Sequence, residues 1–176
     1  MRTVLYIFGL LTDADIEWIA RTGTRRRLRD GDVLTREGEG TEALIILLEG
    51  ELLVTADAVG QIARLAVGEI VGEVSLVDSA PASATVTARG EGVALFLDRT
   101  QLLQKLDGDE GFAARFYRAL AMFLADRLRA TREPKRAGLM DEDAVVEDEL
   151  DLGIVDHISA AGERFNRMLK ILRNQS

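Results

Sequence analysis

Between Thr24 and Asp98 the sequence divides into short apolar runs separated by turn residues. The expected turns are Gly31-Asp32, Gly38-Glu39-Gly40, Glu49-Gly50 and Arg89-Gly90-Glu91-Gly92. Glycine enters turn conformations at little steric cost, so these positions mark the ends of short strands. The expected strands include 43–48, 52–54, 62–65, 69–71, 85–88 and 93–97. Many short strands with frequent turns predict a small antiparallel barrel or sandwich.

Helical patterns flank this strand-rich segment. Before it, Thr12-Asp13-Ala14-Asp15 predicts a capped helix start, because hydroxyl and carboxylate oxygens accept from the free N–H groups of a first turn. After it, a short helix is expected over 101–106 and a long one over 112–132, where apolar residues recur every three or four positions. The long helix is apolar over so wide an arc that two of its sides must be buried, one over the barrel mouth.

The tail is predicted to consist of an acidic linker and a final helix. Residues 135–150 are polar, acidic and without period, whereas 151–176 carry an amphipathic stripe. We therefore expect a domain over 1–134, with its barrel at about 24–98, then the linker 135–150 and the amphipathic helix 151–176. The sequence pattern leaves open whether this last helix folds back on its own dimer or binds a foreign protein.

Composition restricts the chemistry of the chain. Its 176 residues include no cysteine and one histidine, His157, so a thiolate site and a multi-histidine metal centre within one chain are excluded. No nucleophile–base pair and no phosphate-binding Walker loop are found, which predicts a protein that is not an enzyme. The apolar opening TVLYIFGLL is too short to span a bilayer and lacks a cleavage site. We expect a cytoplasmic protein without membrane insertion.

Charge argues against a nucleic-acid partner. The net charge is −8, and an acidic cluster lies within 141–151. A nucleic-acid binder usually has the opposite balance. The arginines of the segment 24–29 are interpreted as a solvated edge strand, where positive charge discourages pairing between sheet edges.

The stretch from Val67 to Ala88, VGEIVGEVSLVDSAPASATVTA, could form a ligand site. Gly72 allows close approach of the backbone, and Glu73 follows it with a carboxylate acceptor. N–H groups at the start of a short helical turn point in one direction and suit an anion. The Ser83 hydroxyl could converge on the same space.

GEVSLVDSAPASATV resembles the phosphate-binding cassette of the cyclic-nucleotide-binding domain family, whose pattern is Gly-Glu, a short helix, then Pro-Arg-Ser/Ala-Ala-Thr. FGLLTDADIEWIA, RLRDGDVLTREGEG and LIILLEGELLV resemble the family's N-terminal helix, first strands and central hairpin, so the likeness extends over roughly 6–131. It implies an α+β fold: an antiparallel double-stranded β-helix (jelly-roll barrel) with flanking helices. It also implies a regulatory protein that forms a homodimer through the long helix 112–132.

The resemblance also implies the site residues. Gly72 and Glu73 take the positions that contact the ribose, with Val74 beside them, while Ser83 and Ala84 take the positions beside the cyclic phosphate. The family's phosphate-binding arginine falls on Ala82. No basic residue lies between Arg64 and Arg89 in the sequence. We therefore predict weak or absent binding of cyclic AMP or cyclic GMP, unless Arg64, Arg89 or a neighbouring subunit restores the charge.

Three functions compete at this point. The first is a small-molecule sensor with little affinity for cyclic nucleotides; the others are a genuine cyclic AMP or cyclic GMP receptor and a ligand-free dimeric interaction scaffold. GFAARFYRALAMFLADRLRATR, with the acidic spacer and the terminal helix, resembles a stand-alone bacterial subgroup associated with bacteriocin-type peptide export. That subgroup lacks a DNA-binding domain, and 133–176 is too short and too acidic for one. The resemblance implies an accessory role, with 151–176 as a candidate surface for a protein partner.

Overall fold

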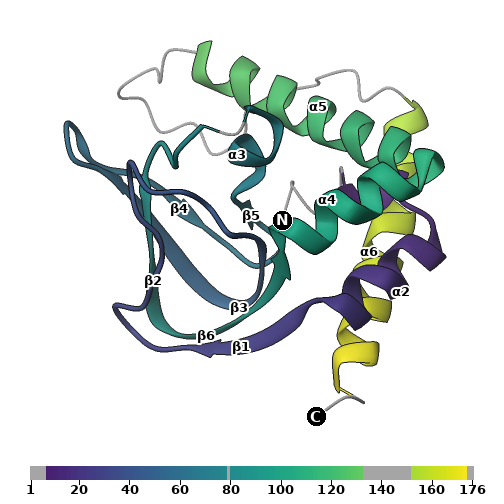
Figure 1. Cartoon of the computed structure of the whole chain (residues 1–176), viewed down its shortest axis with the longest axis horizontal. Coiled ribbons are helices and arrows are strands. Elements are labelled where there is room, and N and C mark those ends of the chain that lie inside the picture. The colour runs from purple at the N-terminus through teal and green to yellow at the C-terminus, as the bar shows by residue number, and fades with distance from the viewer. Residues whose placement is uncertain (1–6, 79, 133–151, 174–176) are drawn as a thin grey trace, which may run out of the picture.

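The computed structural model describes residues 7–78, 80–132 and 152–173, and shows a rolled sheet with helices gathered across one end (Figure 1). The strands are β1 (Thr24–Leu28), β2 (Val33–Thr35), β3 (Ala43–Ala56), β4 (Gly60–Leu65), β5 (Ile70–Val71) and β6 (Thr85–Asp98). After a helical turn at 7–10, the helices are α2 (Asp13–Thr22), α3 (Glu73–Asp78), α4 (Arg99–Gly108), α5 (Glu110–Arg132) and α6 (Leu152–Arg173). The strand order is β1-β6-β3-β4, with β2 on β6 and β5 on β3, and every pairing is antiparallel. The predicted α+β class, an antiparallel barrel with flanking helices, is confirmed.

Two of the expected turns are wrong. Glu49-Gly50 lies inside β3 and the segment 89–92 lies inside β6, so each of these strands runs unbroken for 14 residues. The register between the two strands shifts on either side of Glu49. Gly50 has φ +93°, and a Cβ there would lie 2.8 Å from the Glu91 carbonyl oxygen. The glycines accommodate a bulge between two paired antiparallel strands and do not reverse the chain.

The strand β3 separates two hydrophobic cores. Leu44, Ile46 and Leu48 belong to the core under the helices, whereas Ile45 and Leu47 face the barrel interior. Side chains of a strand alternate between its faces, so both faces of this segment are buried. This explains why residues 43–48 form a continuous apolar run instead of an alternating one.

The helix α6 packs on its own chain in this structure. Ala161, Phe165, Met168 and Leu172 are buried in the core that also holds residues of α2 and α5. Phe165 contacts Phe8, with 6.0 Å between ring centroids. Over residues 161–172, the apolar stripe expected from the sequence therefore packs against the chain's own core, next to α2 (Figure 1).

Three further expectations concern the linker, membrane-spanning helices and the arginine-rich strand. The predicted acidic linker 135–150 lies there in full. In the described segments, no helix combines the length and the apolar character that crossing a membrane requires. The arginine-rich strand β1 is a sheet edge whose first four residues are exposed, which agrees with the interpretation from the sequence.

Candidate functional site

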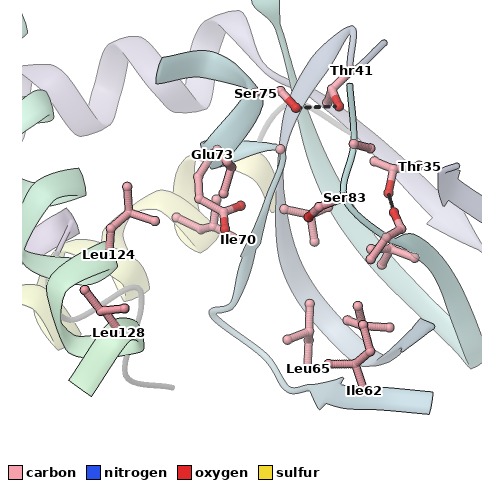
Figure 2. A pocket seen from close by; sticks show the side chains of 17 residues that line it. Thr35, Thr41, Ile62, Leu65, Ile70, Glu73, Ser75, Ser83, Leu124 and Leu128 are labelled. Carbon is pink, nitrogen blue, oxygen red and sulfur yellow. Dashed lines mark hydrogen bonds between the residues drawn. The ribbon is translucent and has the colours of Figure 1, made fainter. Parts of the chain in front are cut away.

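A cavity of about 440 Å³ opens between the barrel and α5. Its walls come from β2 to β5, from α3, from the segment 82–86 and from two leucines of α5. Figure 2 shows Leu124 and Leu128 facing this space from one side, with Ile62 and Leu65 of β4 below and Ser83 opposite. The volume falls in the range of small-molecule sites in proteins.

The structure brings all six residues of the predicted site to this cavity. Its lining includes Gly72, Glu73, Val74, Ala82, Ser83 and Ala84. The first three belong to the junction of β5 and α3, and the last three precede β6. The cassette therefore folds into one concave wall.

Gly72 allows the close approach that begins this wall. Its φ is +91°, and a Cβ at this position would lie 2.6 Å from the carbonyl oxygen of Ala43 and 2.9 Å from the Thr41 methyl group. A larger residue would meet backbone atoms that have little freedom to move, and it would also be strained in this left-handed conformation. The glycine thus holds the start of α3 against β3.

Glu73 is the first residue of α3, and its carboxylate points toward the cavity (Figure 2) although the residue is only 4 % exposed. Two contacts fix the helix that carries it. The Thr41 hydroxyl donates to the Ser75 hydroxyl at 3.3 Å, and an Nη1 of Arg99 donates to the Ser75 carbonyl oxygen at 2.6 Å. The carboxylate is therefore carried on a short helix that is tied to the barrel.

The loop after α3 is clamped by the segment 35–39. The Gly38 N–H donates to the Ala82 carbonyl oxygen at 2.8 Å, and the Ala82 N–H donates to the Glu39 carbonyl oxygen at 2.9 Å. The Thr35 hydroxyl donates to the Ala84 carbonyl oxygen at 3.4 Å. The N–H group of Ala82 is consequently engaged within the fold and is not free to receive an anion.

Two arginines could have replaced the missing positive charge, but neither enters the cavity. Arg64 and Arg89 both lie near the same carboxylate, Glu51, at 3.6 and 3.7 Å, and their side chains are 54 % and 50 % exposed. Neither lines the cavity. Among the described residues of the lining, Glu73 is the one charged side chain.

Sequence reasoning missed part of the lining. Thr35, Thr41 and Ile62 reach the cavity from strands or loops far from the cassette, and no local motif marks them. Leu124 and Leu128 lie on the long helix, and one side of that helix was expected to cover the barrel mouth.

A second, more polar cavity of about 510 Å³ lies on the other side of the segment 35–41. It shares Thr35 and Thr41 with the first cavity, and it contains Arg26 and Arg36 together with several carboxylates. The guanidinium of Arg26 lies over the Phe96 ring, 4.5 Å from its centroid. No motif in the sequence predicts this second cavity.

Comparison with known proteins agrees with this geometry. Residues 25–109 match the family described as "Cyclic nucleotide-binding domain", and this span contains all six predicted site residues. No curated protein has a significant sequence match to the chain.

Solved structures provide further similarity. The N-terminal domain of a transcriptional regulator from Streptomyces coelicolor is 28 % identical, with a TM-score of 0.61 over 76 % of this chain and 98 % of that one. The catabolite activator protein of Thermus thermophilus is 20 % identical, with a TM-score of 0.60 over 97 % and 87 %. The regulatory subunit of a cAMP-independent protein kinase A from Trypanosoma brucei is 22 % identical, with a TM-score of 0.54 over 73 % and 42 %. The last two show a likeness of fold.

Proposed function

We propose a function from the premise that the chain carries a domain of the cyclic nucleotide-binding family over residues 25–109. The domain acts as a non-catalytic regulatory module that binds cyclic AMP and cyclic GMP weakly or not at all. One observation carries this proposal: the cassette forms a cavity at the matched positions, yet no basic side chain is found among the described residues of its lining.

The missing arginine is enough to change affinity. A guanidinium that donates to a phosphate forms charge-assisted hydrogen bonds, each worth roughly 1.5–3 kcal/mol. Its replacement by Ala82 would weaken binding about ten- to a hundredfold, since ~1.4 kcal/mol corresponds to a factor of ten.

The relatives support a regulatory role without requiring a cyclic nucleotide. The similar domain from Streptomyces coelicolor belongs to a protein described as a transcriptional regulator. The similar subunit from Trypanosoma brucei belongs to a kinase described as cAMP-independent. A domain of this fold can therefore serve in regulation where cyclic AMP is not the signal.

The proposal includes a homodimer through α5, as the family resemblance implies. Ala114, Tyr117, Ala121, Leu124 and Leu128 recur at spacings of three and four, as in the seam of a coiled coil. Tyr117 is 44 % and Leu128 57 % exposed, while the opposite stripe of α5 is buried in the chain's own core. An apolar seam of this kind supports contact with a second copy.

Two finer elements of the proposal rest on the sequence alone. One is the accessory role beside a peptide-export apparatus, which depends on the resemblance of the tail, and the other is the cytoplasmic location. The packing of α6 on its own chain favours a tail that stabilises the module over one that is reserved for a foreign protein.

Titration calorimetry with cyclic AMP and cyclic GMP tests the central claim. We expect no complex of micromolar or tighter affinity with the unmodified protein, and a gain of tenfold or more with Ala82→Arg. Ala80→Arg is the matched control, because it adds the same charge to the same loop at an exposed position outside the lining. A micromolar complex with the unmodified protein would refute the proposal, and equal affinities for the two variants would refute the role given to Ala82.

A further inference from the structure

The second cavity, which lies between β1 and the segment 33–42, gathers charged side chains that leave one another unpaired. The charged members of its lining are two arginines and three carboxylates: Arg26, Arg36, Glu39, Glu42 and Asp98. Asp98 has a structural use, because its side chain caps the first turn of α4. The other four form no ion pair with any residue that the structure describes. Charges of both signs are therefore available to a ligand in this cavity.

The alternation of side chains along β1 places one of these cations over the floor of the cavity. Leu28 packs in the barrel core, and Arg26, two residues earlier, faces the same side of the strand. A cation–π contact with Phe96 holds its guanidinium there. Arg27 faces the opposite side and does not line the cavity. Arg26 is thus the arginine of β1 that a ligand in this cavity meets.

The order of the strands keeps the opposite charges apart. Arg26 lies on β1 and Glu42 directly precedes β3, and these two strands flank β6 on its two sides. Paired strands lie about 4.8 Å apart, so the backbones of β1 and β3 are separated by roughly 10 Å. A ligand that carries one charge of each sign can lie over β6 and meet both groups. A simple anion would also approach the carboxylates, and a simple cation would approach the arginines.

The floor between these charges is apolar. Phe96 of β6 and Ile45 of β3 are direct partners in the sheet, and Leu34 of β2 lines the same cavity. Leu34, Ala43 and Phe96 pack against the barrel core but are only partly buried. An apolar group placed on this floor would remove more of their surface from water. The cavity therefore combines an apolar floor with separated charges of both signs.

We propose that this cavity binds a free α-amino acid with an apolar or aromatic side chain. The carboxylate of the amino acid pairs with Arg26, its ammonium group pairs with Glu39 and Glu42, and its side chain covers Phe96. Such pairs are charge-assisted hydrogen bonds, which are stronger than those between neutral groups. The volume of about 510 Å³ falls in the range of small-molecule sites. The inference goes beyond the proposed function, because it gives the regulatory module a second ligand site apart from the cavity beneath α5.

Amino acids and analogues that lack one of the two charges test this assignment. The full chain, labelled with ¹⁵N, is titrated with L-tryptophan and L-phenylalanine, and its amide spectrum is followed. Tryptamine and phenethylamine lack the carboxylate, whereas indole-3-propionate and 3-phenylpropionate lack the ammonium group. We expect saturable binding of at least one of the two amino acids, with one site per chain and amide shifts at 24–26 and 96–98. Each of its two analogues should bind at least tenfold more weakly.

Substitution of the arginine tests which group receives the carboxylate. Arg26→Gln should weaken binding of the amino acid at least tenfold and reduce its preference over the amine to less than threefold. Arg27→Gln is the matched control, because it removes the same charge from the next residue of β1, outside the lining. Its affinity for the amino acid should stay within threefold of that of the unmodified protein.

Substitution of the carboxylates tests the other end of the ligand. Glu39→Gln combined with Glu42→Gln should reduce the preference for the amino acid over the acid analogue to less than threefold. Glu91→Gln combined with Glu163→Gln is the control, since it removes two exposed carboxylates outside the lining and should keep that preference. A merely structural role of the substituted side chains would weaken all three ligands alike.

Each outcome supports or overturns the inference. If neither amino acid binds at millimolar concentration, or if an analogue binds as tightly as its amino acid, the inference is wrong and the proposed function is unaffected. Amide shifts confined to 72–74 and 82–84 would place the amino acid beneath α5 and would also overturn it. Should a variant fail to fold, the analogues and the amide shifts still decide, because they use the unmodified chain. A micromolar complex with cyclic AMP overturns the proposed function alone.

Discussion

Asp15 and Arg115 form a two-point ion pair that joins α2 to α5 across one hundred residues of sequence. Nε of Arg115 donates to Oδ2 of Asp15 at 2.8 Å, and Nη2 donates to Oδ1 at 3.0 Å. The Thr12 N–H donates to the same carboxylate at 2.8 Å, which completes a capping box at the start of α2. The N-terminal helix is thus fixed to the helix that covers the cavity.

This pair predicts a specific response to acid. Burial raises the pKa of Asp15, but hydrogen bonds from Arg115 and Thr12 lower it by more, so its pKa in the folded protein lies below the usual value. A carboxyl whose pKa is lower in the folded state than in the unfolded state stabilises the fold. This stabilisation is complete above the pKa of the unfolded state, about 4, and it is lost as the pH falls through the pKa of the folded state. We expect Asp15→Asn to lower the free energy of unfolding by about 2 kcal/mol at pH 7. That deficit should shrink below about pH 4.

Asp13→Asn is the control for this measurement, since the Asp13 side chain is 55 % exposed and its pairs with Arg164 and Arg167 lie at the surface. Its effect at pH 7 should stay within about 1 kcal/mol. Denaturant unfolding at several pH values compares the three proteins. A deficit of Asp15→Asn that is the same at pH 7 and pH 3 would contradict the role of the carboxylate charge.

A second prediction concerns Gly72, where conformation and space both restrict the residue. Gly72→Ala places a Cβ 2.6 Å from the Ala43 carbonyl oxygen at φ +91°, whereas Gly60→Ala has φ +73° and meets no atom within 4 Å. The second variant should lose about 1 kcal/mol of stability and the first at least twice as much, because only the first adds a clash with backbone. Thermal unfolding measures both. Equal losses of stability in the two variants would show that α3 can shift away from β3 to accommodate the added Cβ.

The cassette was predictable from the sequence because its determinants are local. Gly72 and Glu73 are adjacent, and Ala82 to Ala84 follow after one short helix, so local geometry is enough to form one wall. The opposite wall depends on long-range packing. Ile62 and Thr41 reach the cavity only because β3 pairs with both β4 and β5, and no spacing within the sequence records that arrangement.

The strand breaks show a similar limit. A glycine after a charged residue reads as a turn when the chain is considered alone. Gly50 and Gly92 are instead required because the backbones of the paired strands β3 and β6 approach closely at the register shift: a Cβ at Gly92 would lie 2.6 Å from the Glu49 carbonyl oxygen. The need for glycine comes from a partner strand about forty residues away, so the local pattern predicts the residue type correctly and its role wrongly.

A third prediction tests what α6 contributes. Phe165 is 6 % exposed in the core shared with α2 and α5, so Phe165→Ala should lower the free energy of unfolding by roughly 3–5 kcal/mol. Asn166→Ala, at an exposed position of the same helix, should change it by less than about 0.5 kcal/mol. Deletion of 151–176 should destabilise the protein at least as much as Phe165→Ala. An unchanged melting temperature after that deletion would favour an external partner for this helix.

The proposed homodimer gives the fourth prediction. Tyr117 is the largest side chain of the apolar seam of α5 and is 44 % exposed, and Tyr117→Glu would bury an unpaired carboxylate between two copies. We expect its dimer dissociation constant to rise at least tenfold, which corresponds to ~1.4 kcal/mol. Arg118→Glu is the control: the residue is exposed next to the seam, and the substitution changes the net charge by more than Tyr117→Glu does. Sedimentation across a concentration series distinguishes the two, because repulsion between net charges alone would make Arg118→Glu the more disruptive variant. A monomeric unmodified protein at high micromolar concentration would contradict the dimer itself.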